Sequence, residues 1–341
     1  YAKTPHSSAW TYGHELGRRH LEQTFPNEVT TVSYENVTEK NIASAMEEAI
    51  HAGCNIIFTT TPTFAQESLR AAITHPEVRI LNCSLNTTHR YIRTYYTRMH
   101  EAKFLMGAIA GEMAENDKIV YIADYPILGT IAQINAFALG AQMTNPRAKV
   151  YLEWSTLKEQ DIEKRIDEID PNCISGKDII VPDDNNHFYG VYHRESGGGE
   201  QKNLAMPLCH WGKFYEELIR TIMAGNWEQD NDVEKAINYW WGMPTGVVDV
   251  ICSKKLPAGT VRLVNVLKHN YKTGQFHTFT DQMYAQGHIL KEKKGETLSP
   301  EEVIEMDWLA ENIIGRIPKI EELQEQAKPV LTQQGIETRK G

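Results

Sequence analysis

The chain has 341 residues, of which 41% are hydrophobic and 23% are charged, a composition typical of globular proteins. This length suits two domain-sized lobes, and the formal net charge of −10 disfavours a nucleic-acid binder, which usually carries a basic stripe. No apolar run reaches the ~18 residues that a membrane-spanning helix needs, and no signal peptide is visible at the start of the chain.

The first predicted element is a helix at residues 10–25. A βα fold should start with a strand, yet only residues 1–4 could be the tail of one. We therefore expect the natural chain to extend upstream of residue 1.

From residue 42 onward, helical spacing of apolar residues alternates with short continuous apolar runs. This βαβα order predicts an α/β fold with parallel sheets covered by helices. A polar, glycine-rich surface loop is expected at residues 183–201, and a capped helix start at Ser299 with Glu302. Helices are predicted at 42–50, 69–73, 100–113, 131–141, 162–169 and 211–223, strands at 54–59, 78–83, 119–123, 150–154, 173–175, 238–241 and 246–251, and a short apolar run lies at 204–209.

The five cysteines are odd in number and include no CxxC pair, which disfavours a disulfide framework or a zinc ribbon. We expect small buried side chains with free thiols, and such thiols favour a reducing compartment over an oxidising one.

Signatures of catalysis and of cofactor binding are missing. The chain has no phosphate-binding GxxxxGK[ST], no HExxH and no GxSxG, and the glycines at 197–199 predict a flexible turn. His187 and His193 lie near Asp183 and Asp184, but a solvated loop is the favoured interpretation over a metal site. We therefore expect no catalytic residue, no metal and no cofactor.

The loops that follow the predicted strands concentrate aromatic and hydroxyl side chains. Open parallel sheets bind ligands beyond the carboxyl ends of their strands. Aromatic faces suit a flat heteroaromatic ligand, with stacking of about 1–3 kcal/mol per base, although each tryptophan alone could be a half-buried core residue. The candidate ligand-binding residues are His6, Ser7, Trp10, Thr60, Phe64, Arg98, Asp124, Asp178, Trp211, Trp241, Gly242 and Met243.

Several stretches resemble the basic membrane protein family, the purine-nucleoside-receptor-like substrate-binding components of ABC importers. They fall in order over roughly residues 5–280, whereas the tail from Ser299 onward has no match. The stretches are WTYGHELGR at 10–18, NIIFTT at 55–60, EAKFLMG at 101–107, INAFALGA at 134–141, WG at 211–212 and WWGM at 240–243.

The resemblance implies a type I periplasmic-binding fold, in which two Rossmann-like lobes hold the ligand in a cleft. Lobe 1 is expected at 1–124 plus about 246–285, lobe 2 at 125–245, and a C-terminal helical extension at 286–341. The family sandwiches the base between loops that correspond here to Trp10, Asp178 and residues 241–243. It also implies a monomer outside the cytoplasm that binds a purine base or nucleoside and delivers it to a transporter permease.

The chain departs from the nucleoside-binding pattern of that family at three places. It has Pro5-His6 where a Phe-Asn pair is common, Met99 where an acid aligns and Met243 where a lysine lies. Because apolar side chains cannot pair with ribose hydroxyls, a free base is expected to bind better than its nucleoside.

Two other classes of function stay open. The same cleft could be the ligand-sensing domain of a longer, intracellular regulatory protein, which the cysteines and the missing signal favour. A nucleoside-processing enzyme would need a general base or a carboxylate cluster that faces the sugar, and no such pattern is visible.

Overall fold

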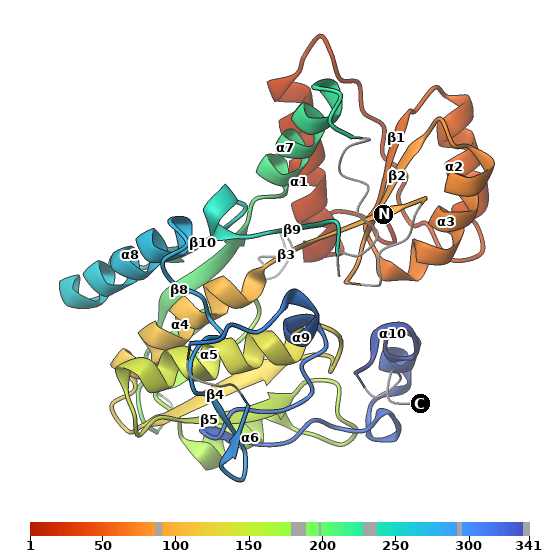
Figure 1. Cartoon of the computed structure of the whole chain (residues 1–341). Coiled ribbons are helices and arrows are strands. Elements are labelled where there is room, and N and C mark those ends of the chain that lie inside the picture. Colours follow the sequence, from red (N-terminus) through yellow and green to blue (C-terminus); the bar gives the residue numbers. More distant parts are fainter. Residues whose placement is uncertain (86–90, 179–188, 198, 228–236, 292–294, 337–341) are drawn as a thin grey trace. The chain divides into compact units, whose positions relative to one another are not determined.

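The computed structural model describes residues 1–85, 91–178, 189–197, 199–227, 237–291 and 295–336, and the described chain divides into two compact units (Figure 1). The first unit holds Tyr1–Thr97 and Cys209–Trp241, and the second holds 98–178, 189–208 and 242–336. The chain passes from one unit to the other at 97–98, 208–209 and 241–242.

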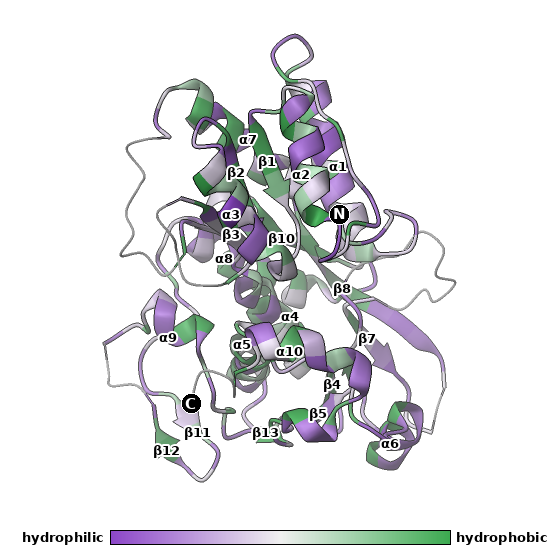
Figure 2. Ribbon diagram, turned by 90° about the vertical axis from the view of Figure 1, so that its right-hand side faces the viewer, coloured by the Kyte–Doolittle hydropathy of each residue, from purple (hydrophilic) through white to green (hydrophobic). Residues whose placement is uncertain are grey.

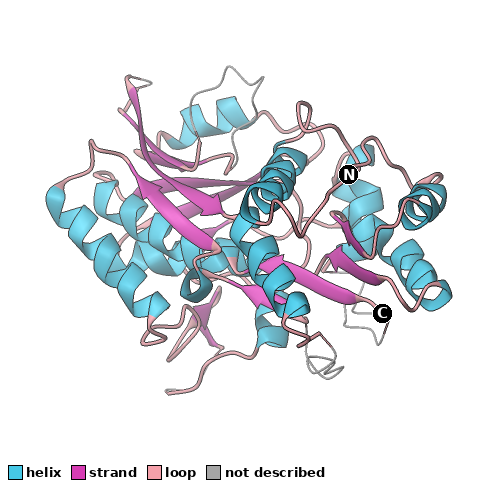
Figure 3. Cartoon of the chain, turned by 90° about the horizontal axis from the view of Figure 1, so that it is seen from above, coloured by secondary structure: helices cyan, strands magenta, loops and turns pink. Residues whose placement is uncertain are grey.

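The first unit is built on a parallel sheet with strand order β1-β2-β3-β9. Its helices pack beside the strands (Figures 1 and 3). The strands are β1 (Ile56–Thr59), β2 (Arg79–Cys83), β3 (Arg93–Thr97) and β9 (Tyr239–Trp241), and the helices are α1 (Ala9–Thr24), α2 (Ile42–His51), η1 (Pro62–Phe64), α3 (Ala65–Thr74) and α7 (Trp211–Met223).

Local chemistry fixes the start of α1. The hydroxyl of Ser8 caps the helix by accepting a hydrogen bond from the backbone N–H of Thr11. Leu21 lies on the buried face of the helix, and Phe25 ends it by donating its N–H to the Leu21 carbonyl. Trp10 is thereby held in the first turn of a helix that is anchored at both ends.

The second unit contains a mixed sheet with strand order β10-β8-β7-β6-β4-β5-β13. Strands β4, β5, β6 and β13 pair in parallel, whereas β7 is antiparallel to both β6 and β8. The strands are β4 (Lys118–Ala123), β5 (Lys149–Trp154), β6 (Cys173–Ser175), β7 (Val191–Arg194), β8 (Gln201–Cys209), β10 (Val248–Cys252) and β13 (Ile313–Ile314), with a separate hairpin of β11 (Tyr284–Ala285) and β12 (Ile289–Leu290). The helices are α4 (Met99–Met113), α5 (Thr130–Thr144), α6 (Ile162–Ile169), η3 (Met243–Thr245), α8 (Ala258–Lys272), α9 (Pro300–Ile304), η4 (Ile320–Glu322), η5 (Glu325–Ala327) and α10 (Lys328–Gln334).

Helices α4 and α5 lie side by side at the centre of the second unit (Figure 1). Two glycines permit the close approach of their backbones. A Cβ atom at Gly107 would lie 1.9 Å from the Phe137 carbonyl oxygen, and one at Gly140 would lie 2.0 Å from the Phe104 carbonyl oxygen. Neither position can take a side chain unless the helices move apart.

The predicted α/β class with parallel sheets is confirmed, and so is the capping box of Ser299 with Glu302. By compactness the described chain divides after Thr97, since α4 packs against α5 in the second unit, and the expected lobe bounds stay a prediction. The region 286–341, expected to be a helical extension, also contributes β13 to the edge of the seven-stranded sheet. None of the helices in the described part of the chain combines the length and hydropathy that a transmembrane span requires.

Replacing Gly107 by alanine should lower the free energy of unfolding by about 1–3 kcal/mol, because the new methyl group meets backbone that cannot rotate away. Gly259→Ala is the matched control, since Gly259 is an exposed helical glycine with nothing within 4 Å of an added Cβ. It should be neutral or stabilising by up to about 1 kcal/mol. Urea unfolding measures both, and equal effects would contradict the close-approach argument.

Candidate functional site

The side chain of Trp10 is held in place in the first unit. Its indole Nε1–H donates to the backbone carbonyl of Thr60 at 2.7 Å, which ties the start of α1 to the loop after β1. The ring stacks on Tyr96 at a centroid distance of 5.9 Å and an interplanar angle of 27°. Trp10 is half-buried, so its position is fixed while part of it stays accessible.

The two other candidate tryptophans of this unit join the same aromatic cluster. Trp211 packs edge-on against Trp10 at 5.6 Å and is only 3% exposed. Trp241 packs on Phe214 at 4.6 Å, and Phe214 contacts Trp211 at 5.6 Å. Trp211 is therefore a core residue that supports the cluster, whereas Trp10 and Trp241 are half-buried.

His14 lies inside this cluster and is absent from the candidates predicted from the sequence. Its ring stacks on Trp211 at 4.1 Å, and its Nδ1 lies 2.5 Å from the hydroxyl of Tyr215. Complete burial lowers the pKa of His14 well below its usual value, and the positive charge of the N-terminal amine acts in the same direction. The ring is therefore neutral at physiological pH, and within the described residues its Nε2 has no hydrogen-bond partner. The signal in the sequence was its i+4 spacing from Trp10, which puts both rings on one face of a helix.

The remaining candidates of the first unit do not gather with Trp10 by their side chains. His6 and Ser7 are exposed, and the Ser7 hydroxyl bonds with Thr4. Phe64 is 2% exposed and packs in a hydrophobic core with residues such as Met46 and Ile80. Thr60 contributes its backbone carbonyl, as described above.

Asp178 in the second unit is anchored by a buried lysine. The Nζ of Lys103 lies 2.6 Å from the Asp178 carboxylate, and the lysine side chain is 2% exposed against 27% for the aspartate. The ammonium group also lies 5.0 Å from the centroid of the Tyr121 ring. Burial alone would lower the pKa of Lys103, but Asp178 and Tyr121 outweigh it and raise the pKa above its usual value. Lys103 is therefore charged and fixes one carboxylate oxygen.

A second buried charge on α4 touches Gly242 and Met243. The Glu101 carboxylate accepts the backbone N–H of Met243 at 2.6 Å and lies 3.1 Å from the Nε of Arg98. A Cβ at Gly242 would lie 2.3 Å from the same carboxylate, so a larger residue there would have to displace the Glu101 side chain. Burial raises the pKa of Glu101, while Arg98 and the Met243 N–H oppose the rise. Glu101 thus brings Arg98 together with the backbone of Gly242 and Met243.

The last candidate, Asp124, lies apart from these groups. It is exposed after β4 and accepts a hydrogen bond from the Ser155 hydroxyl. The structure therefore places the candidates of the second unit at three positions: Asp178 with Lys103, Arg98 with residues 242–243, and Asp124 with Ser155.

Metal binding finds no support in the described residues, which contain no group of three or more potential metal-ligating side chains. His193 lies in β7. His187, Asp183 and Asp184 lie outside the described residues.

The described chain is an α/β protein with a parallel sheet and an aromatic cluster that joins α1 and α7, and comparisons with known proteins specify its class. The family described as "ABC transporter substrate-binding protein PnrA-like" matches residues 3–197. The chain belongs to this Bmp family of substrate-binding proteins, as the sequence resemblance predicted.

Two relatives and one solved structure illustrate the similarity. A purine-binding protein of Brucella abortus is 25% identical over 331 residues, which cover 94% of this chain and 93% of the relative. A Haloferax volcanii protein named for glucose binding by an ABC transporter is 26% identical over 250 residues, 70% of this chain and 62% of the relative. A solute-binding protein of an ABC transporter system from Conexibacter woesei is 11% identical with a TM-score of 0.58, over 81% of this chain and 95% of that one, and it supports the fold alone.

Removing either partner of the buried pair should lower stability, and by different amounts. Asp178→Asn leaves the more deeply buried Lys103 without its counter-charge, so it should cost about 3 kcal/mol of the free energy of unfolding. Lys103→Met leaves only the partly exposed Asp178 unpaired and should cost about 1–2 kcal/mol, a smaller penalty because water still reaches the carboxylate.

The double variant Lys103→Met/Asp178→Asn should be less destabilised than the sum of the two, because no unpaired buried charge remains. Urea unfolding of the parent, the two single variants and the double variant completes this double-mutant cycle. Strict additivity would show that the pair is not coupled.

Proposed function

We propose that this protein binds a purine and presents it, chemically unchanged, to the permease of an ABC transporter outside the cytoplasm. Membership of the substrate-binding family supports the transport role, and the name of the Brucella abortus relative supports a purine as ligand. The observation that carries the proposal is Trp10: a half-buried indole, fixed by its bond to Thr60, at the end of an aromatic cluster. A fixed aromatic ring binds a flat base without losing further side-chain freedom.

His14 and the carboxylates of Glu101 and Asp178 suit binding better than catalysis. Burial keeps His14 neutral, and its Nδ1 is engaged by Tyr215. Glu101 is bound by the Met243 N–H, and Asp178 by Lys103. A general base must be able to reach the substrate, whereas His14 is fully buried and the two carboxylates are already bound by groups of the protein. We therefore expect no turnover of the ligand.

Free thiols in general favour a reducing compartment, but three of the five cysteines, Cys83, Cys173 and Cys209, are also compatible with a location outside the cytoplasm. All five are free, and burial raises the pKa of Cys173 and Cys209 to about 12. Burial also raises the pKa of Cys83 well above its usual value. A disulfide forms through the thiolate, so these thiols stay inert in an oxidising compartment.

A free base should bind more tightly than its nucleoside. Met243 is fully buried and Met99 is half-buried at the start of α4, so neither position offers a charged partner to ribose. Unpaired sugar hydroxyls would cost binding free energy.

Titration calorimetry with adenine, guanine, hypoxanthine, their nucleosides and glucose should show one purine base bound with micromolar or better affinity, and its nucleoside about tenfold more weakly. Chromatography after incubation should recover every nucleoside intact. Tight binding of glucose without any purine would overturn the proposed ligand class, and steady release of free base from a nucleoside would overturn binding without turnover.

Trp10→Ala should weaken purine binding about 10- to 100-fold, which corresponds to the loss of about 1–3 kcal/mol of stacking. Trp308→Ala is the matched control, because Trp308 is also a half-buried tryptophan but lies in another part of the chain and outside the aromatic cluster. Its affinity should equal that of the parent. Melting curves establish that both variants are folded, and parent-like affinity of a folded Trp10→Ala would show that the indole only stabilises α1.

A further inference from the structure

Two of the three crossings between the units within the described residues leave the first unit side by side. Strands β3 and β9 are parallel neighbours, and their last residues, Thr97 and Trp241, are paired in the sheet. The chain passes to the second unit directly after both residues. The crossing at 208–209 is different, because it lies inside β8, which continues through it without a break. The first and last of these connections are therefore tied together on the side of the first unit.

Glu101 ties the same two connections together on the side of the second unit. Its carboxylate accepts the N–H of Met243 at 2.6 Å and lies 3.1 Å from the Nε of Arg98. Met243 is fully buried, and apart from Glu101 and Lys103 the buried stretch of α4 is apolar (Figure 2). The Glu101 side chain is only 6% exposed, so its charge depends on these two partners for its solvation.

Only one residue of each connection lies between the two ties. Arg98 separates the end of β3 from α4, and Gly242 separates the end of β9 from η3. The backbone angles are φ −81° and ψ 63° at Arg98 and φ −140° and ψ −142° at Gly242, which match neither the strand before nor the helix after. Each connection thus bends at a single residue, and Glu101 contacts both bends, since a Cβ at Gly242 would lie 2.3 Å from its carboxylate.

We propose that Glu101 couples these two connections into one hinge. Two chains that are tied on both sides of a one-residue bend can bend only together, whereas separate connections would add independent torsions. This role rests on the function proposed above, because hinge closure around a ligand is a motion that binding proteins of this type use. A free protein with fewer accessible arrangements loses less conformational entropy when it closes.

Double electron–electron resonance on the free protein measures how widely the distance between the units varies. Spin labels are attached through unnatural amino acids at Ser44 of α2 and Asn265 of α8, which are both exposed, so the native cysteines are left unlabelled. Glu101→Gln keeps the size of the side chain but removes the charge that holds Arg98. Its distance distribution should be about 1.5-fold or more wider than that of the parent, because the two connections then bend independently. Equal widths in a folded variant would overturn the proposal.

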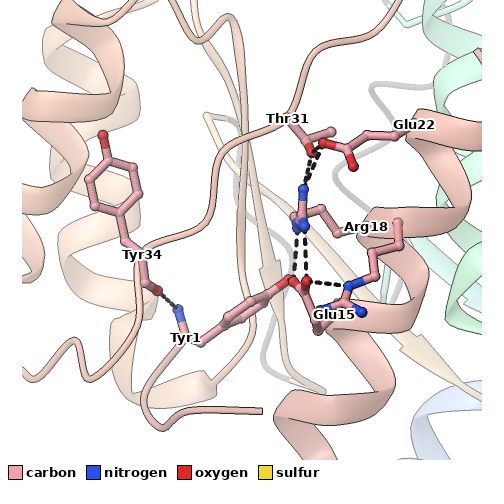
Figure 4. Close-up of polar contacts among 7 residues, drawn as sticks. Tyr1, Glu15, Arg18, Glu22, Thr31 and Tyr34 are labelled. Atoms are coloured by element: carbon pink, nitrogen blue, oxygen red, sulfur yellow. Dashed lines mark hydrogen bonds and ion pairs between the residues drawn. The ribbon is translucent and has the colours of Figure 1, made fainter. Parts of the chain in front are cut away.

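Glu15→Gln is the matched control. The side chain of Glu15 is also 6% exposed, and it pairs at 2.8 Å with Arg18, three residues away on the same helix (Figure 4). Its other partners in the described chain are Arg19 and Tyr1, which also lie in the first unit. Each variant loses one buried carboxylate, so a general loss of stability affects both, but only Glu101→Gln should widen the distribution. Equal widening in both variants would count against a hinge at Glu101.

Titration with the purine base separates the hinge from the proposed function. Glu101→Gln should bind the base about tenfold more weakly than the parent, because fewer of its molecules hold an arrangement that can close, whereas Glu15→Gln should match the parent. A wider distribution with unchanged affinity would show that the coupling does not serve closure. If the parent binds no purine, the proposed function fails, while the widths in the free protein still decide whether Glu101 couples the connections.

Arg98→Met provides a second variant if Glu101→Gln does not fold. It removes the same ion pair from its less buried side, since the Arg98 side chain is 29% exposed. It should widen the distance distribution in the same direction, and a width equal to that of the parent would overturn the proposal.

Discussion

The free-energy cost of burying charged side chains on helix α4 determines which residues lie beside that helix in the second unit. This helix is buried from Glu101 to Gly111, yet two side chains in that buried stretch, Glu101 and Lys103, are acidic or basic. Each must find a partner or lose the free energy of its hydration. Lys103 finds Asp178 and Tyr121, and Glu101 finds Arg98 and the Met243 N–H. The positions of Asp178, Gly242 and Met243 thus follow from the need to solvate two charges inside the protein.

In the first unit, side chains are fixed by aromatic packing rather than by buried ion pairs. His14, Trp211, Tyr215 and Tyr95 form a continuous set of ring contacts, to which Trp10 and Trp241 are attached at the rim. The neutral histidine and the hydroxyl of Tyr215 satisfy each other within this apolar setting. A rigid interior of this kind, together with the bond to the Thr60 carbonyl, holds Trp10 still, which is how a binding surface becomes preorganised.

The sequence predicted the fold class and most elements because apolar periodicity reports burial directly. It also predicted Trp10, Asp178 and residues 241–243, whose roles in binding stay predictions. It did not predict the partners of these residues, because an ion pair such as Lys103 with Asp178 joins positions 75 residues apart. Phe64 and Trp211 show the opposite problem, since an aromatic residue after a strand has the same local pattern whether it faces a ligand or the core. The boundary of the compact units at Thr97 depends on which helix α4 contacts, and a single sequence does not contain that contact.

The crossing of α4 and α5 at Gly107 and Gly140 has a consequence for how the selectivity of such a protein can change over evolution. Because the two backbones are in direct contact, neither glycine can be replaced by even the smallest side chain without moving the helices. The interior of the second unit is therefore conformationally fixed. The loops after the strands bear no comparable restriction. New ligand preferences can therefore arise when loop residues are exchanged while the helices and sheets stay the same. A substitution at either glycine would instead destabilise the fold without changing the ligand preference.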